Sequence, residues 1–193
     1  MKLSPPGAGL PQLERLTIKR VLVPAIRVFI TWDIALLLLK REISIIKKIT
    51  SKIDKSLCTK QVLIDRTFGI EDDTRQFSIN LVLEHLTIAG NALMMVIQTL
   101  SDEKEFTREI TIEAVKPKEN KLNQIDDFTE FYDKYFEFMK NLPKIQSKMT
   151  KRHPWFVGFN NFDWSVFMYM HTFIHRRQIE AIVAKLGDEK DEY

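Results

Sequence analysis

The segment Asn160–Gly187, NNFDWSVFMYMHTFIHRRQIEAIVAKLG, decides the expected fold. Asn160 offers a side-chain acceptor and Asp163 follows three residues later, which is the layout of a helix capping box. Gly187 is a residue type that suits a helix C-cap. At helical spacing, one row of this segment faces inward and consists of Trp164, Met168, His171, His175, Gln178 and Ile182. The segment therefore predicts a helix that carries two histidines and a glutamine on its apolar row.

Helical periodicity of apolar residues also marks three earlier segments, which are residues 12–54, 75–101 and 125–149. We expect the first to be broken or kinked near Pro24 and the third to be disturbed at Pro143, because proline cannot continue a helix interior. Residues 106–115 alternate apolar and polar side chains with the period of a strand. The sequence thus predicts an all-α four-helix bundle with a short extended segment between helices two and three.

The length and composition predict a single domain. A chain of 193 residues with 45% hydrophobic content can bury one continuous core. Residues 1–11 are rich in proline and glycine and cannot hold a helix, so we expect a flexible leader or an arm packed on the surface. Residues 12–187 then form the bundle domain, and residues 188–193 form a charged C-terminal tail.

Charge and cysteine content narrow the classes of protein that fit. Cys58 is the only cysteine, which excludes an internal disulfide framework and favours a reducing, cytoplasmic setting. The 29 basic and 26 acidic residues are mostly interspersed and leave a net charge of +3, which argues against a nucleic-acid partner. The sequence has no glycine-rich phosphate loop and no nucleophile elbow.

One stretch, Val21–Leu39, is apolar enough to raise a membrane anchor as an alternative. It contains Pro24, Arg27 and Asp33, and a charge at the centre of a bilayer costs about 2.5–3.5 kcal/mol on insertion scales. We therefore prefer the interpretation that this stretch is the first, most buried helix of the bundle.

Three of the four histidines fall on apolar helix faces. His171 and His175 are four residues apart, so both imidazoles lie on one face, one turn apart. His85 shares the apolar face of the second helix with Leu81 and Ile88. A buried imidazole needs a hydrogen bond, a charge partner or a metal. Convergence of the three would create a site for a divalent ion, with zinc, nickel and iron as candidates, and an open position for substrate. The alternative is that they are hydrogen-bonded core residues.

Two polar residues on apolar rows are candidates for orienting the ligands or a bound water, because ligating imidazoles usually donate their second N–H. Asp33 is the charged candidate, with an ion pair to Arg27 or a tolerated site at a helix surface as its alternative role. Gln178 is the neutral candidate, with a place at the core edge as its alternative. A few further residues are weaker candidates: His153 or Cys58 as a fourth ligand, Arg176 as a partner of an anionic substrate, and Glu84, which we expect to be exposed.

Two motifs give the chain a resemblance to the DinB/YfiT-like family of metalloenzymes. The first is Phe-Ser-Ile-x-x-x-Leu-Glu-His over residues 77–85. The second is His-Pro-x-Phe-x-Gly from residue 153, followed by Asp-Trp and by His171-x-x-x-His175-x-x-Gln178. The resemblance covers about residues 15–186. It implies a four-helix bundle, often dimeric, with a metal held by His85, His171 and His175. Some members are similar to thiol transferases that use bacillithiol or mycothiol.

The expected function is a metal-dependent reaction on a small-molecule substrate. The metal would acidify a thiol or water, so transfer to the sulfur of a low-molecular-weight thiol is the first candidate and metal-assisted hydrolysis the second. A non-catalytic, stress-related interaction protein that binds metal is the alternative from another class. The helix over 125–149 carries more rings than one buried face needs, which is consistent with a homodimer interface or a pocket wall: Phe128, Phe131, Tyr132, Tyr135, Phe136 and Phe138.

Overall fold

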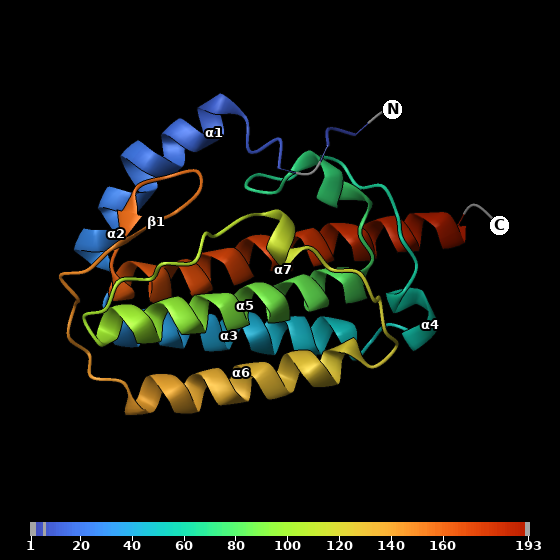
Figure 1. Cartoon of the computed structure of the whole chain (residues 1–193). Coiled ribbons are helices and arrows are strands. Elements are labelled where there is room, and N and C mark those ends of the chain that lie inside the picture. Colours follow the sequence, from blue (N-terminus) through green and yellow to red (C-terminus); the bar gives the residue numbers. More distant parts are fainter. Residues whose placement is uncertain (1–2, 6, 192–193) are drawn as a thin grey trace.

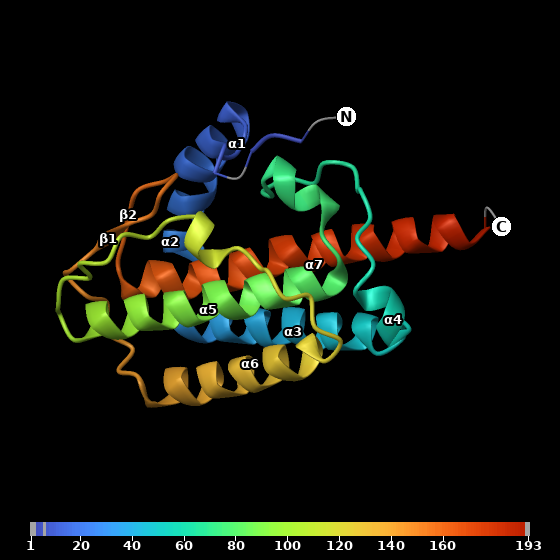
Figure 2. The same cartoon turned by 45° about the vertical axis from the view of Figure 1, so that its right-hand side comes forward.

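The computed structural model describes residues 3–5 and 7–191, with the side chains of 189–191 left aside, and it is mostly helical. Figure 1 shows the long helices lying side by side, and Figure 2 shows the same arrangement after rotation. These helices are α3 (Trp32–Thr50), α5 (Ile79–Ser101), α6 (Gln124–Asn141) and α7 (Asn161–Asp191). The shorter elements are α1 (Gln12–Thr17), the π-helix η1 (Ile18–Leu22), α2 (Val23–Phe29), α4 (Lys55–Cys58), the 3-10 helices η2 (Asp72–Gln76) and η3 (Glu113–Val115), and strands β1 (Lys151–Arg152) and β2 (Gly158–Phe159). The all-α prediction is confirmed.

The first predicted helix is divided, but not at the proline. Pro24 directly follows the π-helical turn η1, and the helical backbone continues through it to Phe29. The break falls at Ile30 and Thr31, and the Thr31 hydroxyl caps α3 by accepting the Ile34 N–H at 3.3 Å. The segments before and after the break meet at 112°. Because α3 starts a new helical register there, the continuous row expected through Asp33 does not form.

Hydropathy identifies α5 as a helix long and apolar enough to cross a membrane, with a mean hydropathy of 1.4. Within the apolar stretch of α5, 61% is buried inside the protein. A helix that is buried in a protein core is apolar on all sides, so its place in the core is sufficient to explain this composition. The stretch Val21–Leu39, the anchor expected as an alternative, is split by the bend between α2 and α3.

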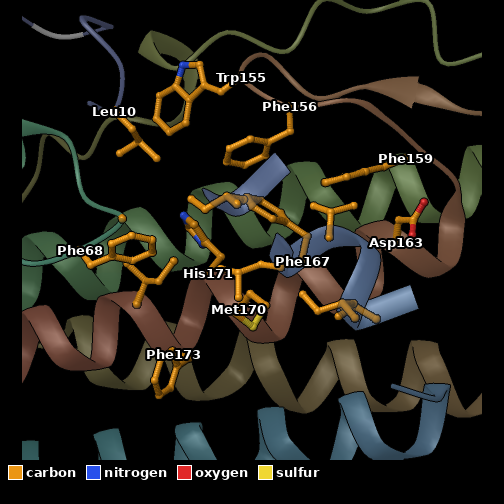
Figure 3. Close-up of a pocket in the computed structure, with 17 residues that line it drawn as sticks. Leu10, Phe68, Trp155, Phe156, Phe159, Asp163, Phe167, Met170, His171 and Phe173 are labelled. Atoms are coloured by element: carbon orange, nitrogen blue, oxygen red, sulfur yellow. The ribbon is translucent and has the colours of Figure 1, made fainter. Parts of the chain in front are cut away.

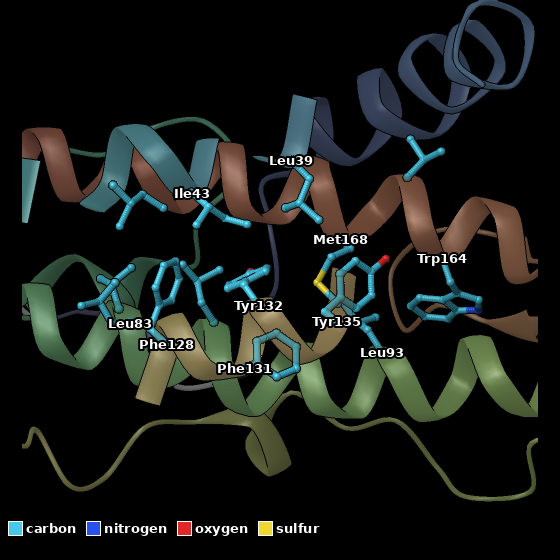
Figure 4. Close-up of a cluster of buried hydrophobic side chains, with 14 of the residues drawn as sticks. Leu39, Ile43, Leu83, Leu93, Phe128, Phe131, Tyr132, Tyr135, Trp164 and Met168 are labelled. Carbon is cyan, nitrogen blue, oxygen red and sulfur yellow. The ribbon is translucent and has the colours of Figure 1, made fainter. Parts of the chain in front are cut away.

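The core lies between the long helices, where α7 packs on α3 and α5, and α6 packs on α5. Figure 4 shows its centre, with Leu39 of α3, Tyr132 and Tyr135 of α6, and Trp164 of α7 pointing inward. Gly90 lets α5 and α6 approach closely, because a Cβ there would come within 2.3 Å of the Phe131 ring. Phe128, Phe131, Tyr132 and Tyr135 of α6 fill the core, whereas the other two rings, Phe136 and Phe138, are half-buried.

Two helix ends differ from the sequence expectation. α6 ends at Asn141, just before Pro143, and does not extend to residue 149. α7 continues past Gly187 to Asp191, so Gly187 is not a C-cap, and no neighbouring group lies within 4 Å of a Cβ built there. The start of α5 is set by Ser78, whose hydroxyl accepts the Leu81 N–H at 3.1 Å.

The connection between α5 and α6 contains no strand, contrary to the alternation over residues 106–115. No neighbouring strand pairs with it, so it runs as coil into the short helix η3. The described chain instead pairs β1 with β2 in an antiparallel hairpin. Glu84, expected on the surface, is buried because its carboxylate accepts the backbone N–H groups of Lys118, Glu119 and Asn120 at 2.7–3.0 Å.

The described part of the leader, residues 3–5 and 7–11, lies against the connection before α5. The Ser4 N–H donates to Asp72 at 2.8 Å, the Gly9 N–H donates to Glu71 at 2.9 Å, and Leu10 is buried. Of the predicted tail, residues 188–191 continue α7, and residues 192–193 lie outside the described residues.

Candidate metal centre

The three histidines predicted to converge lie together between two helices. His85 comes from α5, and His171 and His175 come from successive turns of α7. One ring nitrogen of each lies within 4.8 Å of the others, close enough for all three to hold one ion. The Nε2 atoms of His85 and His171 are 3.1 Å apart. Helical spacing pairs the two α7 histidines, and packing of α5 on α7 adds the third.

Hydrogen bonds fix which nitrogen of His85 carries the proton and which carries the lone pair. Its Nδ1 is 2.8 Å from the backbone carbonyl of Val115, in η3. A carbonyl only accepts, so Nδ1 carries the proton and the lone pair of the neutral ring is on Nε2. The Nε2 of His171 therefore donates to it in the metal-free chain. This arrangement aims the His85 lone pair at its neighbours on α7.

A relay of two hydrogen bonds, from the Thr74 carbonyl through Gln178, orients His175. The Gln178 side-chain N–H donates to the Thr74 carbonyl at 2.7 Å, which turns its Oε1 toward the Nδ1 of His175, also at 2.7 Å. An amide oxygen only accepts, so His175 is protonated at Nδ1 and has a free lone pair on Nε2. Gln178 is completely buried. The structure therefore favours the first of the two roles predicted for Gln178, which is to orient a candidate ligand, His175.

All three imidazoles are neutral near pH 7. Burial lowers the pKa of His175 from 6.5 to about 3, with the nearby His85 ring adding to the effect. Burial and the adjoining histidines hold the pKa of His171 well below its ordinary value, and burial also lowers the pKa of His85. A metal needs neutral imidazoles, so the environment favours the protonation state that ligation requires.

A cavity of about 120 Å³ adjoins the three histidines. The acid that lines it is Glu71, which is not among the site residues predicted from the sequence. Glu71 is 6% exposed, and burial raises the pKa of its carboxyl group above the ordinary value. The tie between the Gly9 N–H and Glu71 could not be seen from spacing, since 62 residues separate the two.

His153, the fourth histidine, lines the same cavity but is not part of the three-histidine group. Its Nδ1 accepts the Trp155 N–H at 3.2 Å, and its ring stacks on Phe156 with centroids 4.4 Å apart. Burial lowers the pKa of His153 to about 3. It belongs to a ring cluster that forms one wall of the cavity.

The other candidates lie elsewhere. Asp33 is placed on the exposed side of α3, where its side chain is 79% exposed and pairs with Lys144, so it orients no histidine. The bend before α3 is the reason. Cys58 is buried at α4 and does not join the group. Arg176 is not a free surface cation, because it pairs with the buried Glu42 and lies over the Phe173 ring.

The donor set fits a divalent ion of the borderline class. Two imidazole nitrogens bound to tetrahedral zinc at about 2.0–2.1 Å lie roughly 3.3–3.4 Å apart, close to the 3.1 Å between His85 and His171. In the part of the chain that the structure describes, no cysteine or carboxylate completes the group. A three-histidine set with an adjoining cavity matches sites that keep a position for water or substrate.

Comparisons with protein-family models, with curated proteins and with solved structures give no match for this chain, so the site is interpreted from its own residues.

Proposed function

We propose that this protein is a metal-dependent enzyme built as a DinB/YfiT-like four-helix bundle, in which His85, His171 and His175 hold a divalent zinc, nickel or iron ion. The observation that carries the proposal is the convergence of three neutral imidazoles beside a cavity. A closed structural site would have a fourth protein ligand, and the described residues supply none at this point.

The first candidate reaction is transfer of an electrophilic carbon to the sulfur of a low-molecular-weight thiol. In this reaction the S–H bond breaks, and so does the bond between the carbon and its leaving group. The S–C bond forms, and the proton departs with the leaving group. A bound divalent ion supplies Lewis acidity that favours the thiolate near neutral pH. Hydrolysis by water at the same position is the second candidate.

The protein's own residues have separable roles in this proposal. The Val115 carbonyl and Gln178 hold the His85 and His175 rings with the proton on Nδ1, so Nε2 is the nitrogen of each ring that carries the lone pair. Glu71 lines the cavity with a raised pKa, so its carboxylate is the group available there to accept a proton. The rings around His153 keep bulk water from that side of the cavity.

Metal content by elemental mass spectrometry tests the site. Untagged protein should carry close to one ion per chain, and His85→Ala and His171→Ala should each lose it while remaining folded by circular dichroism. Asp33→Asn is the matched control, because its exposed carboxylate lies apart from the histidines, and it should retain the metal. Absence of metal after reconstitution with zinc, nickel, iron and manganese would leave a hydrogen-bonded core and overturn the proposal.

Activity separates the two reactions from a non-catalytic role. Consumption of an electrophile that requires both added thiol and bound metal supports transfer to sulfur, whereas turnover without thiol supports hydrolysis. Glu71→Gln should lower turnover without lowering metal content, because Glu71 is outside the three-histidine group. A loaded protein that turns over no electrophile under either condition would favour the interaction-protein alternative.

A further inference from the structure

A second, larger cavity lies on the other side of His171 and is almost wholly apolar. Its volume is about 240 Å³, and it is lined by the segment from η1 to α2, the connection at Phe68 and Gly69, the β1–β2 hairpin and α7. Figure 3 shows Trp155 and Phe156 of the hairpin above it, Phe68 at one side, and His171, Phe167 and Met170 of α7 as its base. The N-terminal helical segment therefore forms one wall of a ligand-sized space.

Few polar groups line this cavity, and its charged side chain is already paired. Among the lining residues, the charged one is Asp163, whose two oxygens accept from Arg27 and which also completes the α7 cap. Among the described residues that line the cavity, none is a lysine or an arginine. An ionised ligand buried there would lose its hydration without gaining a countercharge, which costs several kcal/mol. The lining therefore selects for uncharged molecules.

His171 connects the two spaces, because its imidazole lines both the large apolar cavity and the smaller one at the three histidines. A molecule that fills the apolar cavity thus lies against a candidate metal ligand. The volume also limits its size: an apolar cavity of about 150 Å³ accepts benzene, so about 240 Å³ accommodates a molecule nearer two fused rings.

We propose that the apolar cavity binds the uncharged hydrophobic part of the substrate, of the size of a two-ring aromatic, and presents its reacting end toward His171. The assignment of a reacting end rests on the proposed function, whereas binding of an apolar molecule does not. An ionised thiol is excluded from this cavity by the same argument.

Binding of naphthalene and naphthalene-1-sulfonate to the wild-type chain, measured by quenching of tryptophan fluorescence and by calorimetry, tests the inference directly. The two probes share their rings and differ by one anionic sulfonate group. Naphthalene should bind, and the sulfonate should bind at least about tenfold more weakly because the cavity offers no cation. Failure of naphthalene to bind, or equal affinity for both probes, would overturn the inference without requiring any variant.

A pair of matched variants locates the binding. Ile26→Trp fills the cavity from α2, and Ile49→Trp makes the same change at a similarly half-buried position of α3 that is not part of the lining. Naphthalene affinity should fall at least about tenfold in the first and stay within about twofold in the second. Equal affinities in two folded variants would place the probe elsewhere and reject this cavity.

Metal content of the same proteins keeps this inference separate from the proposed function. Ile26→Trp should lose naphthalene binding and keep its metal, whereas His85→Ala should lose metal and keep naphthalene binding, because His85 lines the smaller cavity and not the apolar one. Metal without naphthalene binding in the wild type would refute the cavity assignment alone, and naphthalene binding without metal would refute the metal site alone.

Discussion

The guanidinium of Arg27 binds both carboxylate oxygens of Asp163, with Nε 2.9 Å from Oδ1 and an Nη 2.7 Å from Oδ2. The same Nη donates to the Gly158 carbonyl at 3.1 Å. The pair fastens α2 to the first turn of α7, and Asp163 is 7% exposed. It also raises the pKa of Arg27, so the link stays charged. The wall that α2 contributes to the apolar cavity is therefore held in part by a bidentate contact between segments 136 residues apart, alongside the bonds from Arg66 and the Gly69 N–H to Glu14.

Loss of that contact should loosen the N-terminal segment without disturbing the histidines. Arg27→Met keeps an apolar stem but removes every donor to Asp163. We expect faster amide hydrogen exchange over residues 12–29 and unchanged metal content. Arg20→Met, at an exposed position of η1, is the control and should exchange like the wild type. Equal protection in both variants would show that packing alone holds the segment.

Gln178→Leu should weaken metal binding although Gln178 is not a ligand. The change leaves the His175 Nδ1–H and the Thr74 carbonyl buried without their partner and releases the ring from its orientation. Loss of such a partner costs about 10–100-fold in metal affinity. Competition with a chelator of known affinity measures it, with the exposed Gln98→Leu as control. Wild-type affinity in a folded Gln178→Leu protein would contradict the relay.

The metal-free protein should lose stability as pH falls below about 6.5, in part because of His153. Its pKa is about 3 in the folded chain against 6.5 when unperturbed, so the unfolded chain takes up the proton first. The stability is complete above pH 6.5 and declines toward pH 3, with this residue contributing about 2 kcal/mol between pH 7 and 5.

Urea unfolding at pH 7 and pH 5, in the presence of chelator, measures this contribution. His153→Asn keeps an acceptor for the Trp155 N–H but cannot titrate, so its stability should fall less between the two pH values than that of the wild type. The comparison uses the pH dependence of each protein, and loss of ring packing in the variant affects both pH values alike. Identical pH dependence would mean that His153 is solvated rather than buried.

Gly90→Ala and Gly187→Ala should change stability in opposite directions, although both glycines lie inside long helices. A Cβ at Gly90 would meet the Phe131 ring at 2.3 Å, so overpacking should destabilise by about 1–3 kcal/mol. A Cβ at Gly187 meets nothing within 4 Å, so the better helix propensity of alanine should stabilise by up to about 1 kcal/mol. Thermal unfolding of both variants decides, and a stabilised Gly90→Ala protein would refute the close packing of α5 on α6.

Local patterns in the sequence were enough for the features that depend on spacing along one helix. The Asn160 and Asp163 capping box is confirmed, with reciprocal hydrogen bonds of 2.8 and 3.1 Å between side chain and backbone. The spacing of His171 and His175 placed two imidazoles on one face, and the apolar surroundings of His85 turned it inward. Such features are predictable because a helix fixes which residues share a face.

Features that depend on contacts between distant segments were decided only by the tertiary structure. The bend at Ile30 and Thr31 moved Asp33 to the surface, and a loop whose backbone N–H groups needed an acceptor buried Glu84. Packing of the leader on the connection before α5 brought Glu71 to the histidine cavity. Spacing along the chain is silent on these contacts, because they arise from satisfying buried polar groups across segments that meet only after folding.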